Sequence, residues 1–470
     1  MATREKGKLA VEDEQAMVSA LRAALRGEVI DRAHPSYDEA RAVWNGLIDR
    51  HPAAIARCAD TTDVVEAVRV VREFRPMVSI RGGGHQVAGS AVCEDGLVID
   101  LSAMRGVHVD PTARTARAQG GALWQELDRE TQLHGLATTG GEVSITGVAG
   151  LTLGGGLGLT GRAFGLACDG LRSIEIVTAD GMVRTASRED HPELLWAARG
   201  GGRGLGVVTS FEFDLKQLGP DVYNAMTIHA YEDAARVLRE FSDLAPQMPE
   251  TVTPEAFFVN IPPIPDFPEE LHGHRVIIVG GIYAGPVDEA APALAPLVAV
   301  GEPMADMSGP VPYVMLQMSF DDMFPDDGRY YMKSHFMDEM TDEAIAALLE
   351  WDRQREHVQA LIALRTMGGV ISRVGPDESA FAHRSAVFNL SMDTKWTDPS
   401  FDEEGIAWAR SSWDALKPFA NGGVYINFSG TADEAEELRG SVLGASEERL
   451  ARIRRDYDPD GLFDTAAYAP

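Results

Sequence analysis

Glycines gather in three clusters of this sequence, at residues 82–84, 140–161 and 200–206. A residue without a Cβ reaches left-handed conformations cheaply and lets the backbone lie flush against a ligand. In the first cluster, which reads Arg81-Gly82-Gly83-Gly84-His85, successive N–H groups can form a nest for phosphate oxygens, with a histidine beside it. Taken alone, this segment fits an ordinary glycine-rich loop as well as a ligand site. Predicted strands separate the clusters, so all three could converge on one elongated ligand.

A formal dinucleotide fingerprint, GxGxxG, occurs at Gly156, Gly158 and Gly161, and Glu175 lies 19 residues beyond Gly156. The fingerprint requires a strand before it and a helix after it. Here it lies inside a glycine-rich stretch of 24 residues, 138–161, that we expect to be almost pure loop and that has no helical periodicity on its C-terminal side. This context argues against a Rossmann fold. The apolar residues spaced through the stretch argue against disorder and suit a long planar cofactor that contains a pyrophosphate; a tight-turned β region is the alternative.

The length of 470 residues exceeds the size at which one hydrophobic core usually stops growing, so we expect two domains. Glycine thins out near residue 216, and prolines, methionines and aromatic residues increase from there to about 417. We therefore predict a cofactor domain over 1–215, a substrate domain over 216–417, and a C-terminal segment, 418–470, that returns to the first domain.

Local patterns predict several elements. The cluster at 60–63 should open a helix that closes before Pro76, and Ala179-Asp180-Gly181 should turn a hairpin. The apolar runs expected as strands are Leu97–Leu101, Ile174–Thr178, Met182–Thr185, Val207–Leu215 as the closing strand of its region, and an aromatic strand, Val424–Phe428.

The formal net charge of −30 disfavours nucleic acid and anionic membranes as partners. The three cysteines show no metal-ligand spacing, and we expect no metal. No stretch approaches the length of a membrane span, and the first residues lack the apolar run of a signal peptide, so we expect a cytoplasmic protein, either a monomer or a homodimer.

Further segments come in a fixed order: Gly89-Ser90, LVIDLS, ARAQGG, ITGVAGLTLGGGLG, FGLACD, IEIVTADG, ELLWAARGGG, GLGVVTSFEFDL, Tyr425-Ile-Asn427 and YDPDGLF. With RGGGH, they resemble the FAD-linked oxidases of the vanillyl-alcohol-oxidase superfamily, in the berberine-bridge-enzyme-like (BBE-like) branch. Bacterial 6-hydroxynicotine oxidases and antibiotic-pathway oxidases are similar along nearly the whole length. The resemblance implies an α+β fold: a two-part PCMH-type FAD-binding domain, completed by the C-terminal tail, with an inserted substrate domain built on a large antiparallel sheet flanked by helices.

The resemblance also implies residue roles. His85 would carry the flavin covalently, through its imidazole to the 8α carbon. The first glycine cluster would bind the pyrophosphate, the second would follow the isoalloxazine ring, and the segment 206–208 would meet the adenine. The implied FAD-binding residues are Arg81, Gly82, Gly83, Gly84, His85, Gly89, Ser90, Gly141, Val143, Thr146, Gly147, Gly150, Gly154, Gly156, Gly158, Gly206, Val208, Tyr425 and Asn427.

This sequence also departs from the family pattern. Many relatives attach the flavin a second time, through a cysteine at the position of Val143, so we predict a single link here. Thr146 holds the position that faces the flavin C4a/N5 edge, where a small residue favours an oxidase. Phe428 stands where a tyrosine is usual and Gly461 where asparagine is common, which puts some contacts of the tail in doubt.

The predicted activity is that of an FAD-dependent oxidase, which removes a hydride from an alcohol or amine carbon of a small metabolite and passes the electrons to O2, giving H2O2. A dehydrogenase with another electron acceptor and a flavin-binding protein without turnover are the alternatives. The resemblance makes Tyr425 the candidate base, with Asn427 beside it. Because a phenol has a pKa near ~10, it would need a cation such as Lys333 or Arg373 nearby; alternatively, Tyr425 only packs on the flavin.

Other polar residues of the predicted substrate domain are ambiguous. For His335, Glu378 and His383 a surface or structural role is favoured over catalysis. The aromatic, methionine-rich segment that holds Tyr313, Gln317 and Tyr331 fits a substrate wall as well as plain core.

Overall fold

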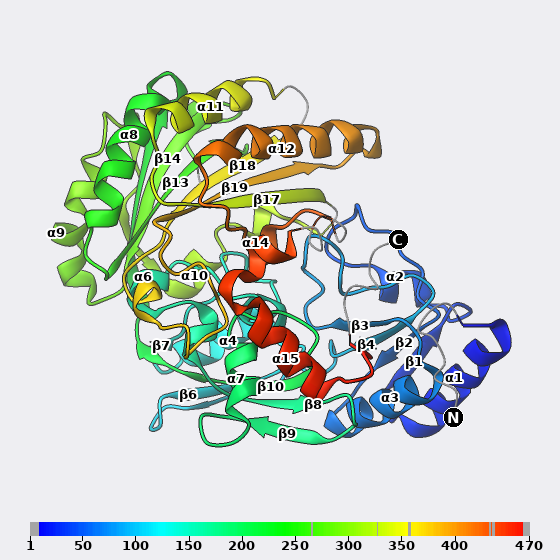
Figure 1. Ribbon diagram of the computed structural model, residues 1–470. Helices are drawn as coiled ribbons and strands as arrows, with labels where there is room; N and C mark the ends of the chain where they lie inside the picture. The colour runs from blue at the N-terminus through cyan, green and yellow to red at the C-terminus, as the bar shows by residue number, and fades with distance from the viewer. Residues whose placement is uncertain are drawn as a thin grey trace.

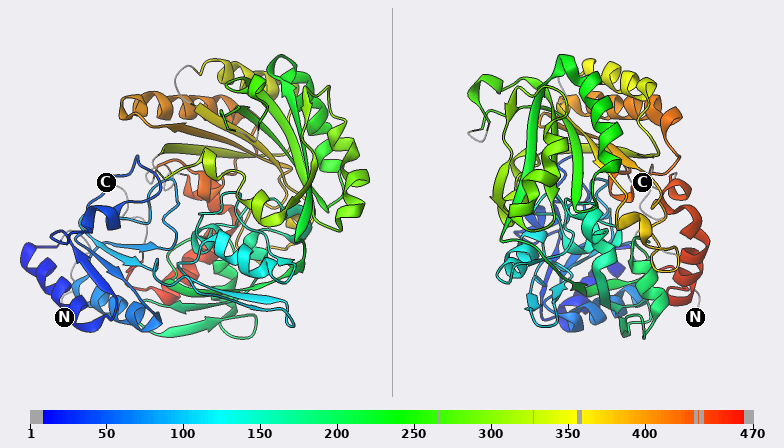
Figure 2. Two further views of the ribbon diagram at one scale, coloured as in Figure 1. Left: turned by 180° about the vertical axis from the view of Figure 1, so that it is seen from behind. Right: turned by 90° about the vertical axis from the view of Figure 1, so that its left-hand side faces the viewer.

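The computed structural model of the protein describes residues 9–264, 267–326, 328–355, 359–431, 434 and 438–463. Its strands form a four-stranded sheet, a five-stranded sheet, an eight-stranded sheet and a small two-stranded pair. The views of Figure 2 show the largest sheet and its helices stacked on the part of the molecule that holds the two smaller sheets. Among the described helices, none has the length and apolar character needed to cross a membrane.

The four-stranded sheet has the order β1-β2-β4-β3, and β4 pairs in parallel with both β2 and β3. Its elements are α1 (Val11–Ala24), β1 (Glu28–Asp31), α2 (Tyr37–Arg41), β2 (Ala54–Arg57), α3 (Thr61–Phe74), β3 (Val78–Arg81) and β4 (Leu97–Asp100). Helix α3 begins where the Asp60 side chain accepts the Asp63 N–H, and it ends before Pro76. The predicted helix is therefore confirmed.

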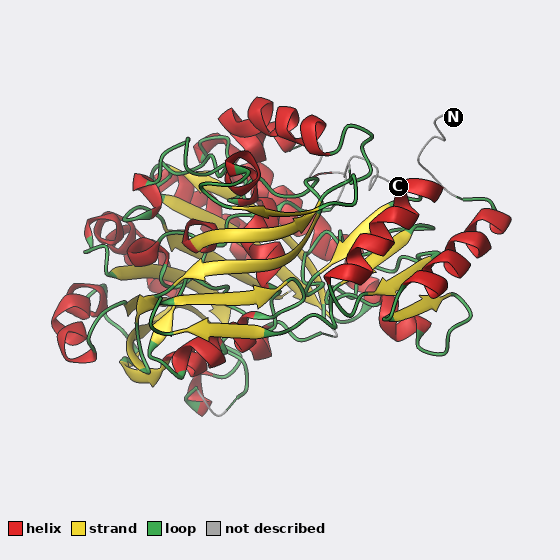
Figure 3. Cartoon of the chain, turned by 90° about the horizontal axis from the view of Figure 1, so that it is seen from below, coloured by secondary structure: helices red, strands yellow, loops and turns green. Residues whose placement is uncertain are grey.

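The five-stranded sheet has the order β5-β6-β10-β8-β9. Its strands are β5 (Val107–Asp110), β6 (Thr115–Gln119), β8 (Leu171–Val177), β9 (Val183–Ala186) and β10 (Val207–Asp214). β8 and β9 pair antiparallel, which confirms the predicted hairpin. β10 comes last in the chain but lies between β6 and β8, so it forms the middle of the sheet and not its edge. Figure 3 views the molecule from the side of the smaller sheets.

Helices and short segments connect these sheets. They are α4 (Trp124–Gln132), β7 (Leu136–Ala137), α5 (Val148–Leu153), α6 (Gly161–Phe164), α7 (Pro192–Ala198) and β11 (Lys216–Gln217), which pairs with β7. The stretch 138–161, expected as almost pure loop, thus contains helix α5, which at six residues is too short to show a helical period in the sequence. The GxGxxG segment follows this helix and not a strand, so the context of a Rossmann fingerprint is absent.

The eight-stranded sheet is antiparallel throughout. Its strands are β12 (Asp221–Ala230), β13 (Val252–Asn260), β14 (Arg275–Tyr283), β15 (Ala305–Asp306), β16 (Gly309–Pro312), β17 (Arg329–Met337), β18 (Gln359–Thr366) and β19 (Phe388–Trp396). Helices α8 (Ala234–Leu244), α9 (Val287–Val298), α11 (Asp342–Arg353) and α12 (Asp402–Leu416) cover its outer face (Figure 1) and bury one large apolar core there. The expected α+β fold with a large antiparallel sheet flanked by helices is confirmed.

The inner face of this sheet turns toward the smaller sheets. Side chains alternate between the faces of a strand. Alternate residues of β18 and β19, such as Leu364 and Leu390, therefore join the outer core, whereas Arg365 and Asp393 point inward, to a cavity described below. The short helix α10 (Tyr313–Gln317) packs beside α4.

The C-terminal segment runs back to the first part of the chain. Helices α14 (Arg439–Leu443) and α15 (Glu447–Tyr457) lead away from the large sheet, and α15 packs on α7 (Figure 1). Leu450 joins the core of the five-stranded sheet, and Phe463 joins the core of the four-stranded one.

The aromatic strand expected at 424–428 is wrong. The chain forms a 3-10 turn over Ile426–Phe428, and the described residues show one isolated β-bridge to the edge strand β17, Lys333 with Ser429, in place of a ladder. Tyr425 packs into an aromatic cluster with Phe336, Phe381 and Phe428, whereas Val424 joins the outer core.

Candidate active site

One large cavity lies between the smaller sheets and the inner face of the eight-stranded sheet. About 1900 Å³ of space there is free of protein atoms, including its opening to solvent. The walls come from β3, from β10 and from the inner face of β17, β18 and β19, so the cavity runs from one half of the molecule to the other.

All three glycine clusters contribute to the walls of this cavity. The sequence-predicted residues that line it are Gly82, Gly83, Gly84, His85, Ser90, Gly141, Val143, Thr146, Gly147, Gly150, Gly154, Gly206, Val208, Tyr425 and Asn427. Segments as far apart in the chain as Gly82 and Asn427 therefore meet at one elongated site.

Four predicted residues do not line the cavity. The Arg81 guanidinium donates to the backbone oxygens of Ala40 and Arg41 and so holds α2 in place. At Gly89 and Gly156 the backbone is left-handed, and at Gly158 a Cβ would overlap the Gly140 oxygen. These residues shape the loops that carry the lining residues.

The first two glycine clusters touch through their backbones. A Cβ on Gly83 would lie 2.5 Å from the Cα of Gly147, and a Cβ on Gly147 would lie 2.5 Å from the Gly83 nitrogen. Real Cβ atoms do not approach other atoms so closely, and backbone cannot move aside as a flexible side chain can. Glycine is required at both positions to bring the two loops together along the cavity.

We expect Gly83→Ala to lower the free energy of unfolding by at least about 2 kcal/mol, because the added methyl group forces the two loops apart. The FAD content of the purified protein, measured by its absorbance, should fall with it. Gly309→Ala is the matched control, because a Cβ there meets open space. Equal stability and FAD content in both variants would contradict the argument from close contact.

His85 is held in a stack of three rings. Its imidazole lies 4.0 Å from the Trp44 ring at an interplanar angle of 15°, and Trp44 stacks in turn on Tyr330 of β17, at 3.9 Å and 10°. The Trp44 indole N–H donates to the Phe324 oxygen. Burial lowers the pKa of His85 to about 3, so the ring is neutral and keeps a free lone pair.

Buried polar side-chain atoms at His85 and Gln86 lack hydrogen-bond partners among the described residues. In the described chain, neither His85 Nε2 nor the side-chain amide of Gln86 has a hydrogen-bond partner, and both residues line the cavity. Leaving such groups unpaired is costly, so a polar ligand is expected beside them. FAD is a long cofactor with polar groups along its length. The unpaired atoms and the glycine-lined walls of the cavity suit such a molecule.

Tyr425 and Asn427 line the cavity from the segment that follows the eight-stranded sheet in the chain. The Tyr425 hydroxyl oxygen accepts the N–H groups of Gly156, at 3.0 Å, and Leu157, at 3.1 Å, and the Asn427 amide, at 2.9 Å. Burial raises the pKa of Tyr425 to about 12. These contacts tie Tyr425 to the glycine-rich segment at 156–157.

The cations expected to assist Tyr425 lie away from it. Lys333 points to the outer face of the sheet, where its ammonium pairs with Glu434 at 3.1 Å and lies over the Trp413 ring. Arg373 pairs with Glu250 at the surface. This part of the sequence hypothesis is wrong, because the side-chain alternation of β17 sends Lys333 to the helix side.

The ambiguous polar residues prove structural. His335 stacks on Trp413 and bonds to its backbone oxygen, and His383 stacks on Phe336. The Glu378 carboxylate accepts the Gly375 N–H. None of these residues is among those that line the cavity.

Tyr313, Gln317 and Tyr331, from the aromatic, methionine-rich segment, are buried in the interior of the protein. Tyr313 is fully buried, and Gln317 donates to Asp128 of α4 and to the Gly141 oxygen. Tyr331 lies in the outer core and donates its hydroxyl hydrogen to Glu434. The substrate-wall interpretation does not hold for these three residues.

Sequence reasoning missed the wall that the eight-stranded sheet supplies. Met332, Leu361, Arg365 and Asp393 of its strands line the cavity, together with Phe320, Phe324 and Phe428 from segments beside the sheet and Glu142 from the second glycine stretch. Trp44 was missed as well. These residues come from separate segments with no shared motif, and only the order of the strands brings them together.

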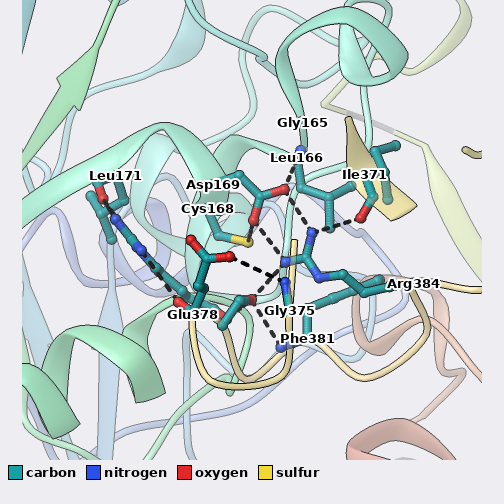
Figure 4. Close-up of polar contacts among 12 residues, drawn as sticks. Gly165, Leu166, Cys168, Asp169, Leu171, Ile371, Gly375, Glu378, Phe381 and Arg384 are labelled. Carbon is teal, nitrogen blue, oxygen red and sulfur yellow. Dashed lines mark hydrogen bonds and ion pairs between the residues drawn. The ribbon is translucent and has the colours of Figure 1, made fainter. Parts of the chain in front are cut away.

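A buried ion pair links the two parts of the molecule beside the site (Figure 4). The Arg384 guanidinium donates to both carboxylate oxygens of Asp169, at 2.7 and 2.8 Å, and also to Ser379 and to the Ile371 oxygen. Asp169 accepts the Leu166 N–H as well, at the end of the second glycine stretch. This contact fixes the glycine loop against the segment that follows β18.

Comparison with known proteins agrees with this geometry. Residues 52–187 match the family model for the FAD binding domain. The chain is 29% identical over 446 residues to YgaK, an uncharacterised FAD-linked oxidoreductase of Bacillus subtilis (strain 168), with 93% of this chain and 96% of the relative covered. It is 28% identical over 457 residues to (R)-6-hydroxynicotine oxidase of Paenarthrobacter nicotinovorans, with 94% and 96% covered.

Solved structures show the same fold. The BBE-like 1 protein of Physcomitrella patens superposes with a TM-score of 0.84 at 20% identity, over 97% of this chain and 99% of that one. A glucooligosaccharide oxidase of Acremonium strictum, whose FAD carries 6-S-cysteinyl and 8α-N1-histidyl links, superposes with a TM-score of 0.81 at 22% identity, over 95% and 97%. The arrangement of the sheets around the cavity is therefore that of BBE-like FAD proteins.

Proposed function

Because the chain belongs to the FAD-linked oxidoreductases and has the BBE-like fold, we propose that it oxidises an alcohol or amine carbon of a small metabolite and passes the electrons to O2, which becomes H2O2. The convergence of three glycine clusters and His85 on one cavity that also reaches the inner face of the large sheet carries this proposal. Such a cavity can hold a long cofactor and a small donor side by side.

His85 is the proposed attachment point of the flavin, and the only one. Its imidazole is neutral and is held flat against Trp44, so a lone pair is available to form a bond to the flavin. Val143 lines the cavity with a side chain that can form no such bond, in contrast to the cysteinyl link in the glucooligosaccharide oxidase.

The bound FAD would supply a two-electron acceptor. The chain's own residues do the rest: Gly82–Gly84 and Gly206 allow close approach of the backbone, and Tyr425 with Asn427 holds the segment at 154–157. Thr146, with its small side chain, leaves room at the wall for O2. The apolar residues of the large sheet exclude water from the donor.

Anaerobic mixing tests this function. The purified yellow protein is mixed with (R)-6-hydroxynicotine, an aromatic alcohol or an oligosaccharide, and the flavin absorbance is followed; a donor of the right class should bleach it. Air-saturated buffer should then restore the absorbance within seconds, with one H2O2 formed per flavin. Slow restoration would favour a dehydrogenase, and no bleaching with any donor would favour a binding protein.

A further inference from the structure

Three consecutive residues, Trp44-Asn45-Gly46, lie between the loop that carries His85 and the edge of the eight-stranded sheet, and we call them the docking joint. At one end, the Trp44 N–H donates to the Gly84 oxygen at 3.2 Å. At the other end, the Gly46 N–H donates at 2.9 Å to the oxygen of Gly328, which directly precedes β17. The joint therefore touches the cofactor loop and the large sheet at once.

Asn45 supplies the central contacts of the docking joint. Its fully buried side-chain amide donates to the backbone oxygens of Val87, at 2.7 Å, and Tyr330, at 2.8 Å, and its Oδ1 accepts the Tyr330 N–H at 2.9 Å. β17 is the last strand of its sheet, and an edge strand presents N–H and C=O groups that need partners. Asn45 pairs both groups of Tyr330 as a neighbouring strand would, while it holds the backbone two residues beyond His85.

The Trp44 ring connects the same two partners. It stacks on the His85 imidazole at 4.0 Å and 15°, and on the Tyr330 ring at 3.9 Å and 10°. Its indole N–H donates to the Phe324 oxygen at 2.9 Å. Side chains that are packed this closely in the interior do not turn without displacing their neighbours. The position of Tyr330 in β17 therefore sets the position of Trp44, and Trp44 sets the plane of the His85 ring.

This plane decides whether His85 can react. Bond formation requires the reacting atoms to be held at the right distance and in the right orientation. His85 lines the cavity, and its Nε2 has no hydrogen-bond partner in the described chain. Because no hydrogen bond at Nε2 fixes the imidazole, its orientation toward the cavity depends on the stack with Trp44.

We propose that Trp44 is a positioning residue for the attachment of FAD to His85, and that Asn45 and Tyr330 make the attachment depend on docking of the eight-stranded sheet. The inference rests on the attachment at His85 put forward in the proposed function. In this step a ring nitrogen of His85 bonds to the flavin 8α carbon, and the imidazole and that carbon each give up one hydrogen. The two hydrogens and their two electrons pass to O2, which becomes H2O2.

The separation of the partners in the chain gives this dependence a consequence for the order of events. Tyr330 lies 285 residues beyond Asn45, so the stack is complete only when the large sheet has folded and packed against the smaller sheets. Before that, the glycine loops can hold FAD, but His85 lacks the face that orients it. We therefore expect FAD to bind first and the covalent bond to form afterwards, in the assembled protein.

The rate of attachment tests the role of Trp44. The full chain is produced in cells starved of riboflavin, purified, and mixed with FAD in air-saturated buffer. Absorbance after gel filtration gives the bound flavin, and fluorescence in a denaturing gel gives the bonded flavin. Trp44→Leu should still bind FAD but form the bond about 10–100-fold more slowly. Trp44→Phe, which restores a flat ring, should recover most of the rate.

A second pair of variants tests the dependence on the sheet. Tyr330→Leu removes the ring of β17 that supports Trp44, and it should slow the attachment as well. Tyr330→Phe keeps this ring and loses only the hydroxyl that donates to the Pro325 oxygen, so it should react as the unsubstituted protein does. Trp351→Leu is the control for loss of a tryptophan, because Trp351 is a half-buried residue of the outer helix α11.

Nuclear magnetic resonance gives a readout that needs no flavin. In protein labelled with ¹³C in the histidine rings, the ring current of Trp44 should shift the His85 signal upfield. The signal is assigned by its loss in His85→Ala. Trp44→Leu and Tyr330→Leu should both move it back toward the ordinary histidine position, and the two phenylalanine variants should not.

The outcomes separate this inference from the proposed function. Attachment and a His85 signal that are unchanged in Trp44→Leu overturn the positioning role, and an unchanged rate in Tyr330→Leu overturns the dependence on the sheet. If Trp44→Leu does not fold, the two Tyr330 variants decide. An unsubstituted protein that binds FAD but releases all of it on denaturation overturns the attachment at His85, and the inference with it. An unsubstituted protein that binds no FAD overturns the proposed function itself.

Discussion

His85→Ala should release all of its flavin on denaturation, whereas the flavin of the unsubstituted protein should stay with the polypeptide through a denaturing gel. The reason is local. The neutral imidazole of His85, fixed against Trp44, is the only described side chain of the cavity wall that we expect to bond to the flavin. In-gel flavin fluorescence measures the difference directly.

Peptide mapping sharpens this experiment. Flavin mass should appear on the peptide that contains His85 and on no peptide from 138–161, because Val143 cannot form a second link. His108→Ala serves as the control, since His108 lies exposed on β5. Free flavin from the denatured unsubstituted protein would refute the covalent link while leaving FAD binding itself intact.

Arg384→Met should destabilise the protein by about 3–5 kcal/mol, because it leaves the Asp169 carboxylate buried without its counter-charge. The two side chains are only 10% and 5% exposed and share two hydrogen bonds. Asp169→Asn should cost a similar amount for the converse reason. The free energy of unfolding, from urea denaturation followed by tryptophan fluorescence, gives the magnitude.

An exposed ion pair in the same part of the chain provides the comparison. Arg373 and Glu250 lie 2.6 Å apart, but their side chains are 58% and 49% exposed. Arg373→Met should therefore cost less than about 1 kcal/mol, because water screens such a pair. The double variant Asp169→Asn, Arg384→Met should be less destabilised than the sum of the single ones. If Arg384→Met and Arg373→Met lowered the free energy of unfolding equally, the ion pair of Asp169 and Arg384 would not be the contact that holds the two parts of the molecule together.

Much of the fold followed from local patterns. The helix after Asp60 and the hairpin at Ala179-Asp180-Gly181 need only neighbouring residues, a cap and a turn. The pattern at 424–428 wrongly predicted a strand. Its aromatic residues pack into an aromatic cluster, and its described backbone forms no strand ladder beside the isolated bridge of Ser429 to Lys333. Helix α5 was missed because six residues are too few to show a helical period.

The sequence by itself determined the loops that face the cofactor, because close backbone approach and left-handed turns demand glycine at particular positions, as Gly83 and Gly147 show. Only the tertiary structure decided which side chains line the rest of the cavity. Strand order and antiparallel register bring Glu142, Arg365 and Asp393 to one wall, send Lys333 to the other face, and surround the Tyr425 hydroxyl with donors. Such proximity depends on contacts between distant segments, which no short stretch of sequence records.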